Sequence, residues 1–263
     1  MKTAIISDVH SNLEALEAVI KDIDKEKVDR IISLGDIVGY GANPNEVIDL
    51  FIEHDIKSVK GNHDEAVLNE ELLEWFNPHA RGAIEKTRAI ITPYSYDYLK
   101  SLPSFLVIKG VRYVHGCPPD SYIDYLGEDE DVSHAQAFHN FREKICFVGH
   151  THWTEGIREK KMEVERYLIK KRKFTEKTLE HVTINYGYSF AVRKGERCIF
   201  NPGSVGQPRN GCDAKYCIFY EDEKEIEPRK VEYDIGKAAK KIRKVIGDES
   251  LAESLYEGGK YPI

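Results

Sequence analysis

Residues 4–12 read Ala-Ile-Ile-Ser-Asp-Val-His-Ser-Asn. The apolar start of this stretch is typical of a buried strand, and two residues that can bind a metal, Asp8 and His10, follow it directly. In an α/β sheet, residues just beyond the carboxyl ends of the strands gather along one edge, where ligands bind. The stretch therefore predicts a strand of an α/β sheet with a metal site at its end.

Four further apolar, strand-like runs end in residues of the same kind. The residues that follow these runs are Asp36, then Asn62 and His63, then His115, and finally His150 and His152. Two carboxylates, an amide oxygen and several imidazoles at one sheet edge suit a pair of divalent cations. A single histidine at a strand end is more often structural, but a set of five such strand ends in one chain argues for a shared metal site.

The spacing within the motifs agrees with this interpretation. Side chains alternate with period two in an extended segment, so Asp8 and His10 share a face, as do His150 and His152. Asp36 follows Gly35 and precedes the turn-rich sequence Ile-Val-Gly-Tyr-Gly. A carboxylate in that position could bridge two ions.

The first half of the chain alternates strand-like runs with helical patterns. Apolar residues from Leu13 to Ile23 recur with helical spacing. Asn43-Pro44, Asn77-Pro78 and Thr92-Pro93 each place an N-cap residue before a proline, which predicts helices that end near residues 54, 91 and 101. This alternation predicts βαβ units and a largely parallel sheet.

The second half is rich in short β-like runs. The expected strands, between about Thr154 and Asp234, are residues 161–169, 179–184, 189–192, 198–200, 216–220 and 229–233. We expect a second sheet from them, with the basic stretch 170–173 as a solvated hairpin tip. Residues 235–246 form an amphipathic helix pattern capped by Asp234. Without a clear linker or repeat, we expect one domain over residues 1–263.

The overall composition argues against several classes of protein. The 263 residues carry a net charge of −7 with a pI near 5.9, which argues against a general nucleic-acid-binding surface. The five cysteines form no C-x-x-C pair, and the apolar stretch 4–6 is too short for a signal peptide or a membrane span. We therefore expect a reduced, cytoplasmic protein that does not insert into a membrane.

The chain resembles the calcineurin-like metallophosphoesterases, because it contains their ligand motifs in order: Asp8-x-His10, Gly35-Asp36, Gly61-Asn62-His63-Asp64, His115 and Gly149-His150-Thr-His152. Residues 7–16, 35–41 and 201–209 further resemble a prokaryotic subgroup of small phosphoesterases. The resemblance implies an α/β fold, a four-layer α/β/β/α sandwich of two mixed sheets flanked by helices. This agrees with a parallel first half and a β-rich second half.

The resemblance also implies a role for each motif residue. A first metal would bind Asp8, His10, His152 and a shared Asp36; a second would bind Asp36, Asn62, His115 and His150. His63 would stabilise the transition state or protonate the leaving group, and Asp64 would orient His63 and raise its pKa. The cofactors implied are two divalent ions, with Mn, Fe, Ni, Co and Zn all compatible with mixed nitrogen and oxygen ligands.

The implied reaction is hydrolysis of a small phosphoester by in-line attack of a hydroxide that bridges the two ions. Phosphodiesterase and phosphatase activity both remain open. Candidate substrate-binding residues are Asn12, Tyr40, His79 and Arg209, and we expect specificity in the loops 70–82 and 118–137. Ser204 lacks the preceding glycine of a G-x-S-x-G nucleophile elbow, so we interpret it as part of a turn. We assign Cys117 a packing role.

Two alternatives use the same fold. A catalytically weak scaffold or protein-binding module would be expected to lose metal ligands or the histidine at position 63, and this chain retains both. A nuclease should add a basic flank or a DNA-capping domain, and neither is evident. We therefore favour an enzyme that acts on a small phosphorylated substrate. A homo-oligomer remains compatible with the sequence.

Overall fold

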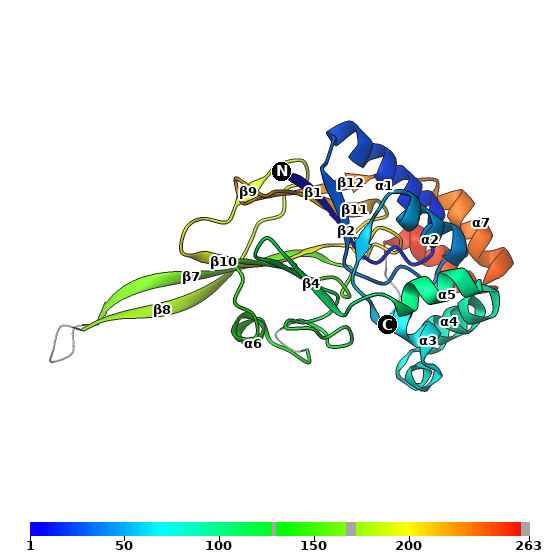
Figure 1. The fold of residues 1–263 in the computed structure, drawn as a ribbon, viewed down its shortest axis with the longest axis horizontal. Coiled ribbons are helices and arrows are strands. Elements are labelled where there is room, and N and C mark those ends of the chain that lie inside the picture. The colour runs from blue at the N-terminus through cyan, green and yellow to red at the C-terminus, as the bar shows by residue number, and fades with distance from the viewer. Residues whose placement is uncertain (128–129, 167–171, 259–263) are drawn as a thin grey trace.

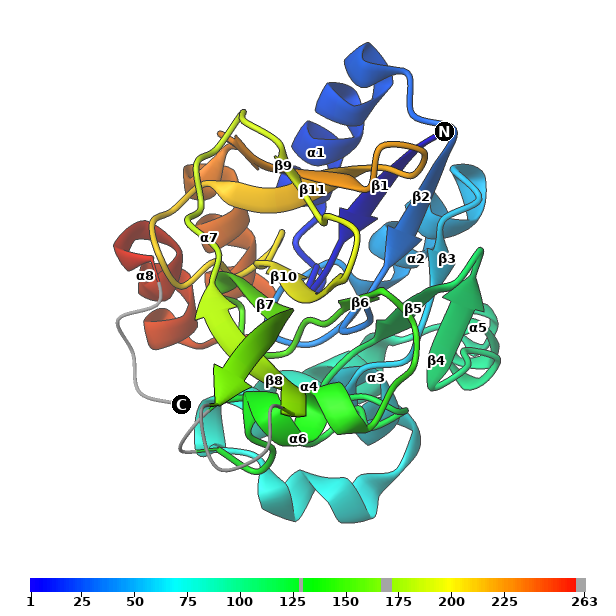
Figure 2. The ribbon, with the colours of Figure 1, turned by 90° about the vertical axis from the view of Figure 1, so that its left-hand side faces the viewer.

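The computed structural model describes residues 1–127, 130–166 and 172–258, and these form two six-stranded sheets packed face to face (Figures 1 and 2). The first sheet has the order β3-β2-β1-β11-β12-β9. Its strands are β1 (Lys2–Ile6), β2 (Arg30–Ser33), β3 (Lys57–Ser58), β9 (Phe190–Ala191), β11 (Ala214–Tyr220) and β12 (Glu225–Val231). The strands β1, β2 and β3 pair in parallel, as predicted, whereas β11 pairs antiparallel with β1.

The second sheet has the order β4-β5-β6-β10-β7-β8. Its strands are β4 (Phe105–Ile108), β5 (Val111–Val114), β6 (Ile145–Phe147), β7 (Thr154–Arg166), β8 (Arg172–His181) and β10 (Glu196–Pro202). The central strand β6 pairs in parallel with β5 and β10, and the outer pairs are antiparallel. Both sheets are therefore mixed, as the resemblance implied.

Helices cover the outer faces of the two sheets. They are α1 (Leu13–Glu26), α2 (Pro44–Glu53), α3 (Asn62–Leu68), the 3-10 helix η1 (Glu70–Trp75), α4 (Pro78–Ile90), α5 (Pro93–Lys100), α6 (His134–His139), α7 (Ile235–Val245) and α8 (Glu249–Glu257). The side chains of Asn77, Thr92 and Asp234 cap their helices as expected, whereas Asn43 makes no cap hydrogen bond. None of these helices is long and apolar enough to cross a membrane.

The core explains the layering. Successive residues of β1 point to opposite faces of the first sheet: Ile5 packs between the two sheets with Phe147 and Phe219, whereas Ile6 packs against α1 and α2. On the outer face of the second sheet, Phe138 of α6 packs in a separate apolar cluster. The order helix, sheet, sheet, helix is the predicted four-layer sandwich, and the prediction of the fold class is confirmed.

The strand boundaries of the β7–β8 ribbon differ from those predicted. β7 begins at residue 154 instead of 161, and β8 covers residues 172–181 instead of 179–184. Residues 172 and 173 of the expected basic tip belong to β8. Residues 167–169 of the expected first strand and residues 170 and 171 of the tip lie outside the described part of the chain. Cross-strand ion pairs of Glu180 with Arg158 and Lys160 help to hold this ribbon, which projects from the body (Figure 1). Such charged strands lack the apolar runs that guided the prediction.

Candidate metal centre

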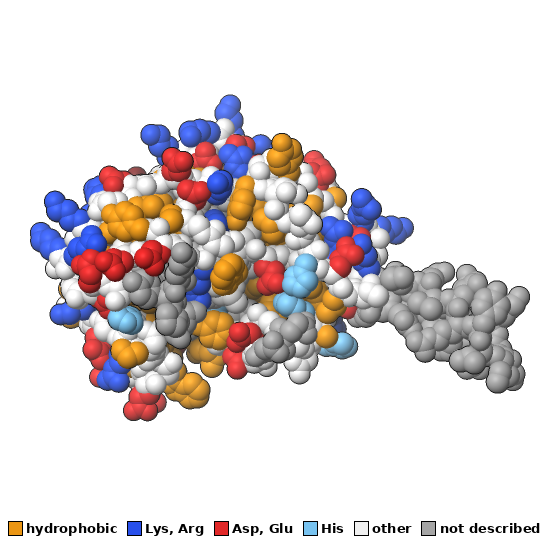
Figure 3. Space-filling view, turned by 180° about the vertical axis from the view of Figure 1, so that it is seen from behind, with side chains coloured by type: hydrophobic (Ala, Val, Ile, Leu, Met, Phe, Trp, Pro, Cys, Tyr) orange, Lys and Arg blue, Asp and Glu red, His pale blue; other side chains and the backbone are white. Residues whose placement is uncertain are grey.

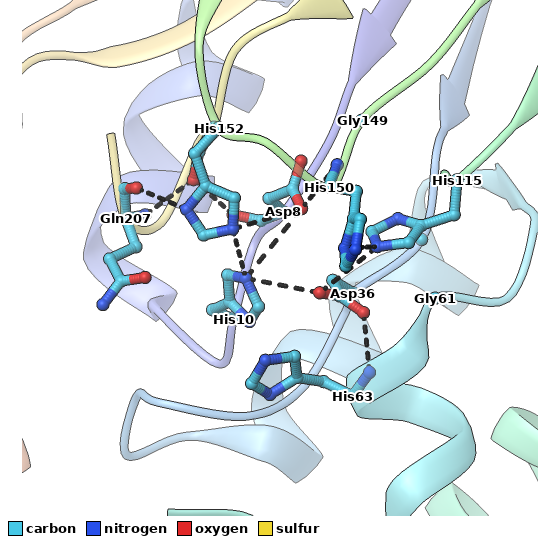
Figure 4. Close-up of polar contacts among 12 residues, drawn as sticks. Asp8, His10, Asp36, Gly61, His63, His115, Gly149, His150, His152 and Gln207 are labelled. Carbon is cyan, nitrogen blue, oxygen red and sulfur yellow. Dashed lines mark hydrogen bonds and ion pairs between the residues drawn. The ribbon is translucent and has the colours of Figure 1, made fainter. Parts of the chain in front are cut away.

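Five strand ends bring the predicted ligands together at one edge of the two sheets. Asp8 follows β1, Asp36 lies beyond β2, and Asn62 begins α3 just after β3. His115 follows β5, and His150 and His152 lie beyond β6. The ligand carboxylates and imidazoles are buried, and these carboxylates and imidazoles point toward one another (Figure 4).

The first group of ligand atoms joins Asp8, His10, Asp36 and His152, and all of these atoms lie within 4.8 Å of one another. His10 Nε2 lies 3.0 Å from His152 Nε2 and 3.5 Å from Asp36 Oδ2. His152 Nε2 lies 3.4 Å from Asp8 Oδ1. This is the ligand set that the resemblance implied for a first metal.

The second group contains Asp36, His115 and His150. His115 Nε2 lies 3.4 Å from Asp36 Oδ2, 3.2 Å from His150 Nδ1 and 3.1 Å from Asn62 Oδ1. Asp36 is thus common to both groups, and the amide oxygen of Asn62 faces the second group.

Hydrogen bonds to backbone carbonyls define which imidazole nitrogens face the centre. The Nδ1 atoms of His10, His115 and His152 donate to carbonyl oxygens of Val38, Leu34 and Gln207, and His150 Nε2 donates to that of Ile123. A carbonyl can only accept, so each of these nitrogens carries the proton when the ring is neutral. The opposite nitrogens then present lone pairs toward each other, which repel unless a cation lies between them. The donor set therefore fits divalent metal ions.

Charge in the centre supports the same conclusion. Asp8 and Asp36 are fully buried, and although burial opposes ionisation, neighbouring histidines hold both carboxyl pKa values below their usual range. Burial lowers the pKa of His150 to about 3, so this ring is neutral and ready to bind a metal. Burial also disfavours the charged form of His115, but the carboxylate of Asp36 outweighs this effect and raises the pKa of His115 to about 9. In the absence of metal this ring therefore holds a proton on Nε2, which a bound cation would displace.

The backbone at the centre adopts conformations that are rare outside glycine. Five ligand residues have positive φ angles: Asp8 (53°), His10 (47°), Asp36 (52°), His150 (69°) and His152 (62°). Each costs free energy and persists only where surrounding contacts enforce it. Here Asp8 N donates to Gly35 O and His10 N donates to Asp36 O, so the two ligand loops hold each other.

The approach of Asp36 requires a glycine opposite it. A Cβ atom on Gly61 would lie 2.0 Å from Asp36 Oδ1. The same oxygen accepts a hydrogen bond of 2.9 Å from the backbone of His63. Gly61 therefore lets the start of α3 approach the shared carboxylate, and the backbone N–H of His63 then holds Asp36 Oδ1.

His63 lies beside the first ligand group in an aromatic cage. Its ring centroid lies 4.7 Å from that of His10, 4.6 Å from that of Tyr40 and 4.9 Å from that of Phe76. Its Nδ1 atom is buried without a hydrogen-bond partner. Burial lowers the pKa of His63 to about 4, so the ring is neutral at neutral pH.

Asp64 does not contact His63 in the way expected from the sequence, and the pKa of His63 is lowered by burial where an increase caused by Asp64 was expected. The carboxylate of Asp64 accepts hydrogen bonds from the backbone N–H groups of Ile37, Val38 and Gly61, at 2.9, 3.1 and 3.0 Å. Among the described residues no hydrogen bond joins Asp64 to the ring of His63. Burial raises the pKa of Asp64 to about 7. Asp64 thus fastens the Asp36 loop to the start of α3.

The four candidate substrate residues lie in different environments. Tyr40 packs against His10 and His63, at the centre. The side-chain oxygen of Asn12 caps α1, and its side-chain nitrogen donates to Gly206 O, so both polar atoms of the amide already have partners within the fold. His79 is exposed, and its Nδ1 atom lies 2.7 Å from Asp248 Oδ2; among the described residues no hydrogen bond or ion pair joins it to the proposed ligands.

Arg209 is the fourth candidate. Burial lowers the pKa of its guanidinium, while Tyr40, Tyr125, Asp8 and Asp36 act on it electrostatically in the opposite direction. It makes no hydrogen bond or ion pair with another residue in the described ranges. Its charge is therefore available near the centre.

Ser204 and Cys117 have the structural environments expected of them. Ser204 Oγ donates to Asp8 O and accepts from Gln207 N, both at 2.8 Å, which fastens the turn to the ligand loop. Cys117 is buried, and its thiol donates to Asp124 O at 3.3 Å. Neither side chain is positioned as a nucleophile.

A pocket beside the second ligand group contains residues that the sequence analysis did not single out. Its volume is about 370 Å³, and its lining includes Trp75, Phe76, Ile123, Asp124 and Tyr125. These residues lie within the loops 70–82 and 118–137, where specificity was expected. No local motif marks the individual side chains, and only their exposure in the folded chain distinguishes them.

Comparisons with known proteins agree with the geometry. A model described as the calcineurin-like phosphoesterase superfamily domain matches residues 1–224. An uncharacterised protein of Methanocaldococcus jannaschii is 39% identical over 263 residues, which cover 97% of each chain. A crystal structure of a metallophosphoesterase from Sphaerobacter thermophilus is 36% identical, with a TM-score of 0.76, and covers 98% of this chain and 99% of that one. A hypothetical protein from Pyrococcus horikoshii, 19% identical over 99% of each chain, shares the fold with a TM-score of 0.74.

Proposed function

Since the chain belongs to the calcineurin-like phosphoesterase superfamily, we propose that it hydrolyses small phosphoesters at a centre of two divalent cations. The first cation would bind Asp8, His10, Asp36 and His152, and the second would bind Asp36, Asn62, His115 and His150. One observation carries the proposal: two groups of converging ligand atoms share a single buried carboxylate.

The two cations would supply a nucleophile at neutral pH and polarise the phosphoryl group. Asp8 and Asp36 bring two negative charges to the centre, fewer than the four positive charges of two divalent ions. The loaded centre is therefore net positive and attracts a phosphate even though the chain as a whole is acidic. On the face shown in Figure 3, Lys and Arg side chains lie interspersed with Asp and Glu side chains. The net charge of −7 argues against a general polynucleotide-binding surface and favours a small substrate.

His63 would act on the leaving group. Its neutral ring offers one N–H group to a phosphate oxygen, and an adjacent phosphate anion would favour the imidazolium form. A proton delivered to the leaving oxygen contributes about 10²–10⁴-fold to the rate. Arg209 has no partner of its own among the described residues, and its guanidinium suits a second phosphate contact.

The state of the cysteines indicates the redox environment in which the protein works. All five are free, and four of them are buried. We infer a reducing environment such as the cytoplasm.

A metal-reconstituted activity screen tests the proposal. The chelated protein would be loaded with Mn, Fe, Ni, Co or Zn and assayed with bis(p-nitrophenyl) phosphate, p-nitrophenyl phosphate, a cyclic nucleotide and a dinucleoside polyphosphate. We expect hydrolysis of at least one substrate with bound metal near two ions per chain, and loss of both in Asp36→Asn. Inactivity toward every substrate in fully loaded protein would contradict the proposal.

The role of His63 has its own test. We expect His63→Ala to lose about 10²–10⁴-fold in kcat and to keep its full metal content, because the imidazole is not among the proposed ligands. His152→Ala is the matched control, since it should lose metal as well as activity. Normal turnover in His63→Ala would exclude the proton-donor role.

The stereochemical course distinguishes direct attack from a phosphoenzyme. Hydrolysis of a chiral phosphorothioate in ¹⁸O-labelled water should invert the configuration at phosphorus. In the proposed reaction the oxygen of water attacks phosphorus directly, and a single in-line displacement inverts the configuration. Net retention would require a covalent intermediate and would refute direct attack.

A further inference from the structure

The pocket beside the second ligand group is positioned to hold the part of a substrate that carries the phosphate. Asn62, His63 and His150 form its inner wall, so any occupant lies next to the proposed centre. Its volume of about 370 Å³ lies in the lower part of the range of small-molecule sites. The pocket thus suits a compact group attached to the phosphate.

Aromatic side chains line much of the pocket. Tyr40 and Phe76 pack on His63, and the Tyr125 ring lies 3.8 Å from the His150 ring, tilted by 32°. Trp75, at the end of η1, also lines the pocket and is 85% exposed. A tryptophan so exposed contributes little to the core, and its face is available for stacking.

The charges of the pocket are acidic. Asp124 and Asp131 line it, and none of its described lining residues is a lysine or an arginine. Asp131 accepts a hydrogen bond from Tyr125 N at 3.0 Å. The carboxylate of Asp124 forms no hydrogen bond or ion pair with any residue that the structure describes. It can therefore accept N–H groups from a ligand.

We propose that the pocket binds the base of a nucleoside phosphoester, with preference for bases that carry an exocyclic amino group. This inference rests on the proposed function, because it places the phosphate on the metal centre. A planar base would stack on the aromatic walls, and its amino group would donate to Asp124. The Watson–Crick edge of uracil has carbonyl oxygens flanking its single N–H group, so two acceptors would face the carboxylate and uridine should bind more weakly.

Binding of free nucleosides tests the pocket without turnover. Trp75 and Trp153 are the two tryptophans of the chain, so Trp153→Phe leaves Trp75 as the single fluorescent reporter. We expect adenosine, guanosine and cytidine to quench the fluorescence of Trp75 and to bind about 10-fold more tightly than uridine. Uridine lacks the amino group that would donate a hydrogen bond to the carboxylate of Asp124. Ribose and choline serve as probes for the sugar alone and for a cation held by the aromatic walls.

Two variants and a control separate stacking from hydrogen bonding. Trp75→Ala, with binding measured by calorimetry, should weaken all nucleosides by about 10-fold, in line with base–aromatic stacking. Asp124→Asn should reduce the preference over uridine and leave stacking intact. Tyr188→Ala removes an aromatic that is also largely exposed but does not line the pocket, and it should change neither result.

The outcomes distinguish this inference from the proposed function. Hydrolysis of bis(p-nitrophenyl) phosphate without nucleoside binding would overturn the base-binding inference and leave the hydrolase proposal standing. Nucleoside binding without hydrolysis of any phosphoester would support the pocket and contradict the hydrolase. Binding of choline that is tighter than that of every nucleoside, or equal binding of ribose and adenosine, would also overturn the inference.

Discussion

Gly39 packs directly against the ring of His63. Its φ angle is 97°, and a Cβ atom at this position would lie 2.4 Å from His63 Nδ1. The ring has no hydrogen bond at that nitrogen, so packing against Gly39, Tyr40 and Phe76 is what orients it. The position of the proposed proton donor thus depends on the absence of a side chain.

Gly39→Ala should therefore impair catalysis without removing metal. A displacement of the imidazole by about 1 Å is expected to cost about 10²-fold in kcat. The measurement is kcat together with metal content per chain. Gly110→Ala is the matched control, since Gly110 also has a positive φ of 75° but its added Cβ would meet nothing within 4 Å. Equal losses in both variants would indicate backbone strain alone.

Asp64 provides a second prediction, because it binds backbone where a contact with His63 was expected. In Asp64→Asn, one amide N–H would face a backbone N–H, so we expect the free energy of unfolding to fall by roughly 1.5–3 kcal/mol. Urea denaturation measures this change. The pH dependence of kcat should keep its shape. A displaced pH profile with unchanged stability would instead support direct coupling between Asp64 and His63.

Backbone geometry decides which contacts around the centre could be predicted from the sequence. The convergence of the proposed ligands could be predicted because each follows an apolar strand, and strand ends meet at a sheet edge. The partner of Asp64 was mispredicted because adjacent residues on a helix point in different directions. Asp64 lies three residues after Gly61, the spacing of a capping box, and that pattern was the available signal. The positive φ angles of the ligands follow from tertiary contacts and have no local signature.

Among whole elements, helices that begin with proline were predicted most accurately. Helices α2, α4 and α5 each begin at the expected proline, because proline fixes φ and lacks the N–H group that a first turn leaves unpaired. The sequence analysis predicted no helix at α8, although Asp248 caps it and Leu251 and Leu255 are buried. The β7–β8 ribbon was misplaced because the sequences of its two strands are rich in charged residues and lack the apolar runs that guided the prediction.

Glu221 links elements of both sheets. It accepts hydrogen bonds from Thr3 of β1 and Arg30 of β2, and from Lys109, which lies between β4 and β5. Burial opposes its ionisation, but these partners outweigh burial and lower the pKa of Glu221 to about 2. Folding therefore stabilises the ionised form of Glu221 relative to its protonated form.

The stability contributed by Glu221 should depend on pH in a defined direction. Its pKa is depressed on folding, so the contribution is complete above the unfolded value of about 4.5 and is lost as the pH falls toward 2. Glu221→Gln should lower the free energy of unfolding by roughly 1–3 kcal/mol at pH 7, and by less at pH 3. Chemical denaturation at both pH values measures this. Glu223→Gln, at an exposed neighbour, is the control, and a pH-independent effect of Glu221→Gln would contradict the assignment.

The proposed centre joins the two sheets of the molecule. The first sheet supplies Asp8, Asp36 and Asn62 through the ends of its parallel strands, and the second supplies His115 and the 150–152 segment. The fold class could be predicted because the strand–helix alternation, the β-rich runs and the ordered ligand motifs all favour two sheets flanked by helices. The expectation that the strands of the second half form a sheet of their own was wrong, because β9, β11 and β12 extend the first sheet, while β4 and β5 belong to the second. The contact between the two sheets could not be predicted, because it depends on side chains far apart in the sequence, such as Ile5 and Phe147.

A centre shared by both sheets should couple metal binding to global stability. Divalent metal binds the assembled ligands and not the unfolded chain, so metal at 100 times its Kd should add about 2.7 kcal/mol to the free energy of unfolding for each site. We expect Tm to fall on chelation and to rise with added Mn. Asp36→Asn, which removes the shared ligand, should abolish the rise, whereas Asn62→Ala should reduce it by weakening one site. A Tm that does not respond to metal in the wild-type chain would show that the converging ligands do not hold a cation, and the proposed chemistry would fail with it.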